Sequence, residues 1–145
     1  MTELESLSFY LNGYNKFILD RNVNNMGKLK HKGSGLAIFL HEKFDSVVFR
    51  PDLSLSICDF EILCVEIISE NIFVFSCYRS PNGNFDTFIV ELDRLLVKLN
   101  DFRNHKGYIF GDMNVNLYNL TSKCRKYLDC IFSNNFIRYL PSEVF

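Results

Sequence analysis

The chain has 145 residues, of which 48% are hydrophobic, 23% charged and 15% aromatic. This composition is typical of a globular domain and excludes a disordered tail, a collagen-like repeat and a coiled coil. The formal net charge is −1, so nucleic-acid affinity would have to come from a local patch. No apolar run reaches the roughly 20 residues that span a bilayer, and the acidic N-terminus predicts no signal peptide and no membrane partner. Five cysteines without a C-x-x-C pair indicate an intracellular, reducing compartment.

Apolar runs in the first half of the chain predict a series of short strands. In chain order they cover residues 16–19, 35–40, 46–49, 61–68 and 71–78. The last two are separated only by Ser69-Glu70, which predicts an antiparallel hairpin, and their near-continuous apolar character predicts cover on both faces. Glu61 and Glu66 on this hairpin are expected to face solvent or to be paired.

The second half combines helical and strand patterns. Residues 85–99 carry one apolar stripe at helical spacing, and Asn84 or Asp86 suits the first turn of that helix. Later segments predict a short buried strand over 108–110, a helix over 122–132 capped by Thr121, and a further strand over 136–140. The order of the elements predicts an α/β or α+β layered fold, with residues 1–145 in one partial domain.

The segment most informative about chemistry is Gly111-Asp112-Met113-Asn114, which follows the apolar strand over 108–110. Residues i and i+2 of an extended chain point to the same side, so Asp112 and Asn114 are expected to project together. Asp112 could orient or deprotonate a water, and Asn114 could hold a phosphate oxygen or a metal. Taken alone, however, the tetrapeptide is more typical of a simple turn.

A second polar segment, Tyr78 to Asn82, also follows the end of an apolar strand. The phenol of Tyr78 could contact a phosphate. In isolation, a half-buried ring at a strand end, with Pro81 and Asn82 as turn residues, is the more usual explanation.

The stretch from Arg21 to Leu40 contains no acidic residue. Its basic residues include Arg21, Lys28, Lys30 and Lys32, which could lie along a phosphate backbone and bind it in a salt-sensitive way. A solubilising loop explains these charges equally well.

The order of these features resembles the endonuclease/exonuclease/phosphatase superfamily, and most closely the endonuclease domain of non-LTR (LINE-type) retrotransposons. The matching stretches, in order, are Gly13-Tyr14, Asp20-Arg21, Gly33-Ser34-Gly35, Tyr78-Arg79-Ser80-Pro81 and Gly111-Asp112-Met113-Asn114. Ser80 stands where the family pattern has a proline and Met113 where it has a phenylalanine. The resemblance covers about Gly13 to Pro141.

This resemblance implies a four-layered α/β sandwich and Mg²⁺-dependent nicking of DNA. It implies that Asp112 positions the attacking water and that Asn114 and Tyr78 bind the scissile phosphate, with Asn82 approaching the same site. It also implies DNA and the reverse-transcriptase domain of a parent polyprotein as partners, and a nuclear location for a functional protein.

Several functional elements of the family have no match in this sequence. The family has an asparagine on its first strand, a metal-binding glutamate on an early strand and a C-terminal Ser-Asp-His motif. All three histidines, His31, His41 and His105, precede Asp112. The chain is therefore expected to be a copy incomplete at both ends, with metal ligands unknown, that is inactive or nearly so alone.

Two other functions stay open at this point. One is a phosphatase of the same superfamily, against which the basic stretch and the Tyr-Arg-x-Pro pattern argue mildly. The other is a degenerate binding module without catalysis.

Overall fold

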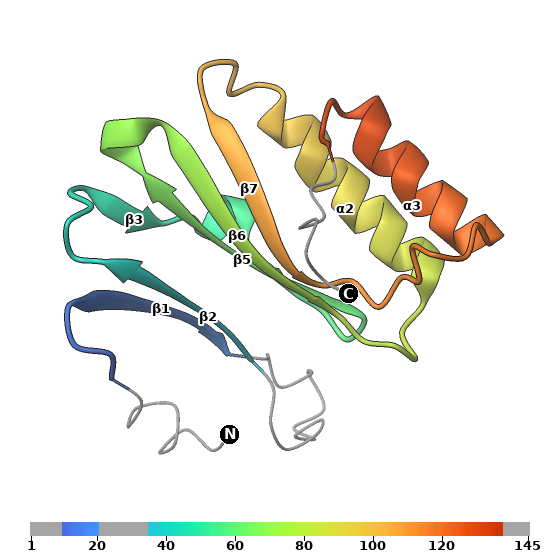
Figure 1. Ribbon diagram of the computed structural model, residues 1–145, viewed down its shortest axis with the longest axis horizontal. Helices are drawn as coiled ribbons and strands as arrows, with labels where there is room; N and C mark the ends of the chain where they lie inside the picture. Colours follow the sequence, from blue (N-terminus) through green and yellow to red (C-terminus); the bar gives the residue numbers. More distant parts are fainter. Residues whose placement is uncertain (1–9, 21–34, 138–145) are drawn as a thin grey trace. The chain divides into compact units, whose positions relative to one another are not determined.

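The computed structural model describes residues 10–20 and 35–137. The chain divides into two compact units. Unit 1 contains the described strands and runs up to Gly83, with Asn104–Asn114 added later in the chain. Unit 2 contains the two described α-helices and is formed by Asn84–Arg103 and the residues from Val115 onward (Figure 1). In the described part of the chain the result is a mixed α/β structure with two sheets and two α-helices; the four-layered arrangement stays a prediction.

Among the described residues, the larger sheet of unit 1 has five strands. Its order is β3–β5–β6–β7, and the short β4 pairs with β5. The strands are β3 (Val47–Phe49), β4 (Leu55–Ser56), β5 (Phe60–Ile67), β6 (Ile72–Arg79) and β7 (Lys106–Asp112). β5 and β6 form the predicted antiparallel hairpin, whereas β6 and β7 are parallel. A 3₁₀ turn, η2 (Ile68–Glu70), and Asn71 in the left-handed region (φ 54°) connect the hairpin in place of the expected two-residue link. A second 3₁₀ turn, η1 (Pro51–Leu53), precedes β4.

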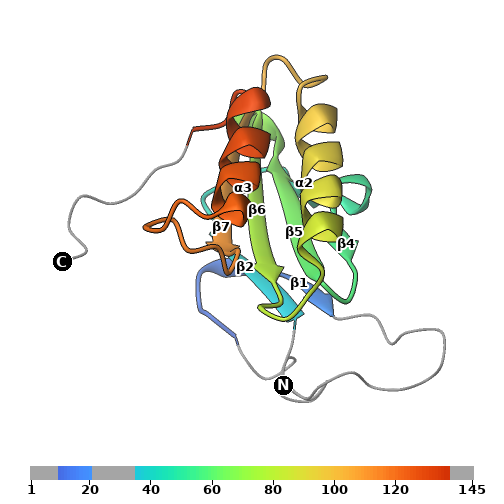
Figure 2. The ribbon, with the colours of Figure 1, turned by 90° about the vertical axis from the view of Figure 1, so that its right-hand side faces the viewer.

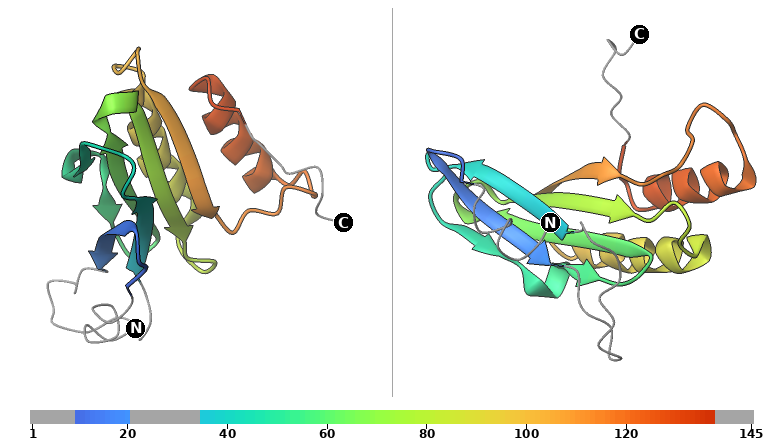
Figure 3. Two further views of the ribbon diagram at one scale, coloured as in Figure 1. Left: turned by 60° about the vertical axis from the view of Figure 1, so that its left-hand side comes forward. Right: turned by 90° about the horizontal axis from the view of Figure 1, so that it is seen from below.

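A smaller antiparallel sheet pairs β1 (Tyr14–Asp20) with β2 (Gly35–His41). Leu36 and Ile38 of β2 are buried with Leu63 and Val65 of β5 in one apolar cluster. The two sheets of unit 1 therefore pack face to face, with β2 over β5 and β6 and β1 over β5 (Figure 3). Alternating apolar residues on β2 and continuous apolar residues on β5 are the sequence origin of this core.

On β7, the face that points toward the smaller sheet is largely exposed to solvent. Tyr108 is 46% exposed and Phe110 is 62% exposed, whereas Leu63 on the same face of the sheet is fully buried. The prediction of a buried strand over 108–110 is therefore wrong for these two rings, although the strand itself exists and is longer than expected. An apolar strand pattern does not reveal whether a second sheet is wide enough to cover it.

Unit 2 pairs helix α2 (Phe85–Leu99) with helix α3 (Ser122–Ser133), and the two run side by side in the same direction (Figure 2). The bounds of α2 are those predicted from its apolar stripe. Asn84 and Thr121 cap the helices as expected, since their side chains accept hydrogen bonds from the backbone N–H groups of Thr87 and Cys124.

Residues 136–137 form no strand, and the rest of the strand predicted over 136–140 lies outside the described residues. Neither described helix is long and apolar enough to cross a bilayer.

A polar network centred on Glu66 connects β5 to the segment before β7. The Glu66 carboxylate accepts a hydrogen bond from Arg50 and lies 3.0 Å from Nε2 of His105. Arg50 also donates twice to Asp52, and the His105 ring stacks on Phe73 with a centroid distance of 4.7 Å. The expectation that Glu66 is paired is confirmed.

Replacing Glu66 by glutamine is expected to lower the free energy of unfolding by about 2 kcal/mol, because glutamine keeps the shape but leaves the mostly buried Arg50 without this charge partner. Urea denaturation measures the change. Glu91→Gln serves as the control, because the Arg94 side chain that pairs with Glu91 is 70% exposed and such pairs contribute less than about 1 kcal/mol. Equal losses in the two variants would contradict the structural role of the network.

Candidate functional site

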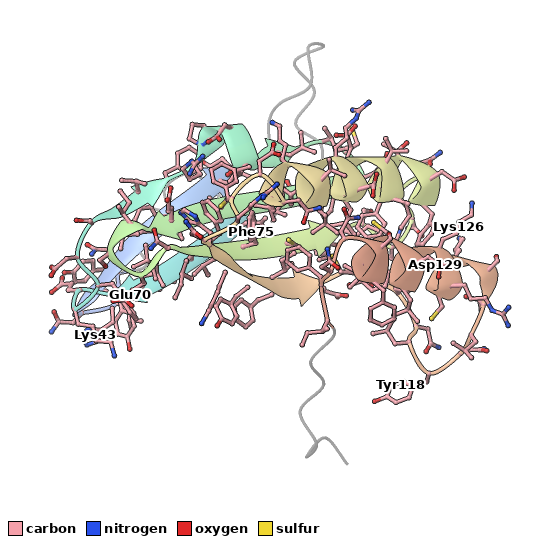
Figure 4. The ribbon with its side chains drawn as sticks, turned by 90° about the horizontal axis from the view of Figure 1, so that it is seen from above. Lys43, Glu70, Phe75, Tyr118, Lys126 and Asp129 are labelled. Atoms are coloured by element: carbon pink, nitrogen blue, oxygen red, sulfur yellow. The ribbon has the colours of Figure 1, made fainter. Side chains whose placement is uncertain are left out.

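Two of the predicted site residues end neighbouring parallel strands. Tyr78 on β6 is the direct partner of Asp112 on β7 in the strand register. Partners on adjacent strands point to the same face, so the phenol and the carboxylate stand next to each other on one face of the sheet. Both lie where these strands end, far from the turns that carry Lys43 and Glu70 (Figure 4). This edge, with Tyr78, Asp112 and Asn114, is called the strand-end rim below.

Tyr78 and Asp112 differ in their exposure. The Tyr78 ring is half-buried and packs against the apolar cluster between the two sheets of unit 1. Asp112 is exposed. The rim therefore combines a phenol that is held in place by packing with a carboxylate that is accessible to water and to ligands.

Asn114 is brought to the same rim by a turn. The chain leaves the extended conformation after Asp112, and Asn114 has a φ of 49°. Its backbone N–H donates to Oδ1 of Asp112 at 2.8 Å, and its side-chain amide donates to the carbonyl oxygen of Arg79 at 2.6 Å. Asp112 and Asn114 are thus adjacent, but through turn hydrogen bonds and not through the strand alternation that the sequence predicted.

Arg79 holds this turn from β6, a role that the sequence pattern alone does not indicate. The residue is 5% exposed. Nε donates to the carbonyl oxygen of Met113 at 2.7 Å, and Nη2 donates to that of Asn114 at 2.9 Å. Strand alternation places Arg79 on the face opposite Tyr78, so it supports the turn from behind. A charged residue at the very end of an apolar strand is the sequence signal that could have indicated such a contact.

Gly111 allows β7 to approach β6 closely just before Asp112. Its φ is 149°, and a Cβ atom there would lie 1.9 Å from the carbonyl oxygen of Cys77. Only glycine fits this position, because any side chain would overlap the backbone of the neighbouring strand. The close approach sets the spacing between the two strand ends that carry Tyr78 and Asp112.

Asn82 is exposed in the turn that follows β6. That turn is fixed by hydrogen bonds from Gly83 N to Ser80 O and from Ser80 N to Asp59 O, both at 3.1 Å. The described hydrogen bonds do not join Asn82 to the strand-end rim. The other predicted binding residues, Arg21, Lys28, Lys30 and Lys32, lie outside the described residues.

Glu61 is a further carboxylate in the same row. It is the partner of Tyr78 on the β5 side, so Glu61, Tyr78 and Asp112 follow one another across three strands. Glu61 is only 2% exposed, so it does not face solvent, and it lies within 3.4 Å of Ser56 Oγ. The strand register needed to find this row could not be derived from the sequence pattern of β5 alone.

The residues around the rim do not make a complete metal site. Among residues 10–20 and 35–137, no group of three or more His, Cys, Asp or Glu side chains comes together as metal ligands. Asp112 is the exposed carboxylate of the rim, and two strand spacings, about 10 Å, separate its Cα from that of Glu61. Protein-bound Mg²⁺ commonly relies on one or two carboxylates with waters and substrate phosphates, so Asp112 fits only as one such ligand.

The fold has a counterpart among solved structures. No protein-family model matches the sequence, and no curated protein matches it. The structure described as "Endonuclease domain of TRAS1, a telomere-specific non-LTR retrotransposon" is similar with a TM-score of 0.54 and 10% sequence identity. The match covers 82% of this chain and 52% of that chain, so this chain spans about half the length of the solved domain. The likeness establishes a relationship at the level of the fold, to a retrotransposon endonuclease domain.

Proposed function

We propose that this chain is part of a retrotransposon-type endonuclease domain and that its strand-end rim binds a phosphodiester of DNA. The observation that carries the proposal is the side-by-side placement of Tyr78 and Asp112 at the carboxyl ends of two parallel strands, with Asn114 bonded to Asp112. Ligands of α/β sheets commonly bind outside the carboxyl ends of parallel strands. The likeness to a solved endonuclease domain supports the same class of substrate. The proposed fold of the whole domain is the four-layered sandwich.

In this proposal each rim residue has a separate role. Asp112 orients the attacking water, since an exposed carboxylate can accept its hydrogen bond. The phenol of Tyr78 and the amide oxygen of Asn114 contact the phosphate group directly or through its bound water, and Asn82 lies in the next turn. Mg²⁺ is the proposed cofactor, which would offset charge on the phosphate when bound. Asp112 is the ligand that the rim would contribute to it.

The proposed partners are DNA and the reverse-transcriptase domain of a parent polyprotein. Arg21, Lys28, Lys30 and Lys32 are proposed to bind the phosphate backbone, because the chain as a whole has a net charge of −1 and needs a local basic patch. The proposed location during such a reaction is the nucleus.

We further propose that the chain alone binds DNA but cleaves it little or not at all. Of the two described histidines, His105 directly precedes β7, about 20 Å from Asp112 at the other end of that strand, and contacts Glu66. His41 ends β2 and accepts a hydrogen bond from Lys43 N. General acid–base catalysis commonly contributes about 10²–10⁴-fold to a rate, so its loss leaves little activity.

Fluorescence anisotropy with a labelled DNA duplex tests the binding. We expect affinity to fall as salt rises, and replacing Lys28, Lys30 and Lys32 by glutamine to reduce the slope of log K against log salt by up to about 3. The matched control replaces Lys98, Lys123 and Lys126 of unit 2 by glutamine and should leave that slope unchanged. Binding that is equally sensitive to both triple replacements would contradict the proposed patch.

Nicking of supercoiled plasmid in Mg²⁺, with and without a chelator, tests the catalytic part. We expect no difference between the wild type and Asp112→Ala. Nicking that requires Asp112 would overturn the proposed inactivity while supporting the role of the rim. Hydrolysis of a phosphate monoester that requires Asp112, without DNA binding, would replace the nuclease proposal by the phosphatase alternative.

A further inference from the structure

β7 forms one edge of the larger sheet of unit 1. Among the described residues it pairs only with β6, and it is the last strand in the order β3–β5–β6–β7 (Figure 3, left). Five of its seven residues are exposed. Gly111 is one of them, and because a glycine has no side chain, its exposure is exposure of the backbone itself. A strand edge of this kind presents N–H and C=O groups that can pair with another strand.

The pairing with β6 defines which backbone groups of β7 face the outer edge. The N–H group of Lys106 donates to the carbonyl oxygen of Asn71, where the parallel pairing with β6 begins. Successive residues of a strand direct their backbone groups to alternate sides, so every second residue from Lys106 onward bonds to β6. The N–H and C=O groups of Gly107 and Ile109 therefore point to the outer edge.

The sequence of β7 is complementary to itself when it is read in the opposite direction. It is Lys-Gly-Tyr-Ile-Phe-Gly-Asp, so Ile109 is central and every other residue has a counterpart at the same distance on the other side. Glycine corresponds to glycine, ring to ring, and cation to anion. Strand alternation places Lys106, Tyr108, Phe110 and Asp112 on one face of the sheet, and all four are exposed.

We propose that two copies of this chain pair through the outer edges of β7, antiparallel and about a two-fold axis at Ile109. The two Ile109 residues exchange backbone hydrogen bonds. Tyr108 of each copy then lies opposite Phe110 of the other, and Lys106 lies opposite Asp112, in the pairs whose side chains approach most closely. The dimer gains two ring pairs and two ion pairs, and cross-strand contacts of both kinds stabilise neighbouring strands.

Other arrangements of the same two edges lack this complementarity. Parallel pairing in register would place Lys106 next to Lys106 and Asp112 next to Asp112, and like charges on neighbouring strands destabilise a sheet. An antiparallel shift of two residues would separate Lys106 from Asp112. A shift of one residue would turn the side chains of the two copies to opposite faces. Charge and ring positions therefore select one register and one partner, a second copy of this chain.

The pairing also adds a cation to the strand-end rim. Lys106 of the second copy lies next to Asp112, and within the described part of one copy neither of these side chains has an ion-pair partner. An ammonium group at this place attracts the phosphodiester that the rim is proposed to bind. This consequence rests on the proposed function, whereas the pairing of the two edges does not.

Sedimentation equilibrium of the full chain, without DNA, tests the pairing. We expect a weak monomer–dimer equilibrium, because one strand edge buries less surface than a stable dimer interface. Lys106→Glu should raise the dimer Kd at least about tenfold, since it replaces attraction to Asp112 by repulsion in both ion pairs. Lys43→Glu makes the same change of charge in the exposed turn after β2 and should leave the Kd unaltered.

An exchange of the two charges tests the register. Asp112→Lys alone should weaken the dimer at least about tenfold, and the double variant Lys106→Asp/Asp112→Lys should restore it, because opposite charges face each other again. Hydrogen exchange of the Gly107 and Ile109 amides should slow as the chain concentration rises, since these groups become paired only in the dimer.

A chain that is still monomeric at about 1 mM would overturn the proposal. So would a dimer that the double variant does not restore, or a dimer in which the outward amides of β7 exchange as fast as in the monomer. These measurements contain no DNA, and the proposed DNA binding is tested separately through Lys28, Lys30 and Lys32. Failure of the dimer is therefore distinguishable from failure of the proposed function.

Discussion

Replacing Gly111 by alanine is expected to destabilise unit 1 by about 2–5 kcal/mol. The added Cβ would lie 1.9 Å from the carbonyl oxygen of Cys77 and 2.7 Å from its carbonyl carbon, and backbone atoms inside a sheet cannot move aside as side chains do. Overpacking costs about 1–3 kcal/mol, and the positive φ of 149° adds about 1–2 kcal/mol for any residue with a Cβ. Urea denaturation measures the total, and hydrogen exchange of β6 and β7 shows whether the two strand ends separate.

Gly13 provides a control that separates the two costs. It also has a positive φ, of 80°, but a Cβ atom there would meet no other atom within 4 Å. Gly13→Ala is therefore expected to cost only the backbone strain, about 1 kcal/mol. Similar losses in the two alanine variants would mean that the close approach of β7 to β6 does not set the structure of the rim.

The parts of the fold that the sequence predicts well are those that depend on local periodicity. Residues 85–99 repeat their apolar side chains at helical spacing, and α2 has these same bounds. β5 and β6 are continuous apolar runs close together in the chain, so their antiparallel pairing also follows from local information. Burial of Tyr108 and Phe110 was predicted wrongly because it depends on how far β2 extends over the larger sheet, which is a property of residues distant in sequence.

The candidate site was predictable to a similar degree. Two apolar strands ending in polar residues were enough to select Tyr78 and Asp112, but their direct pairing needed the parallel register of β6 and β7. Asn114 was expected to project from an extended chain, whereas its left-handed conformation and its bond to Arg79 bring it back to Asp112. Such a turn depends on carbonyl groups that are positioned only in the folded chain, so no pattern in the four residues specifies it.

Replacing Arg79 by methionine is expected to lower the free energy of unfolding by about 3 kcal/mol and to release the turn at Met113 and Asn114. The buried guanidinium donates two short hydrogen bonds to the carbonyl oxygens of these residues, and a hydrogen bond to a charged group contributes about 1.5–3 kcal/mol. Lysine should restore little of this stability, because one ammonium group cannot reproduce the planar arrangement of guanidinium donors. Urea denaturation gives the loss, and hydrogen exchange at residues 111–116 shows whether the turn opens.

Arg94→Met is the matched control for this variant, since the Arg94 side chain is 70% exposed and pairs only with the neighbouring carboxylate of Glu91 among the described salt bridges. It should change stability by less than about 1 kcal/mol. A turn that opens in Arg79→Met should also disconnect Asn114 from Asp112, so the variant separates these two residues of the strand-end rim without altering either one. If the turn stays protected from exchange in that variant, the hydrogen bond from Asn114 N to Asp112 Oδ1 is sufficient to hold the turn. Arg79 would then stabilise the sheet without positioning the strand-end rim.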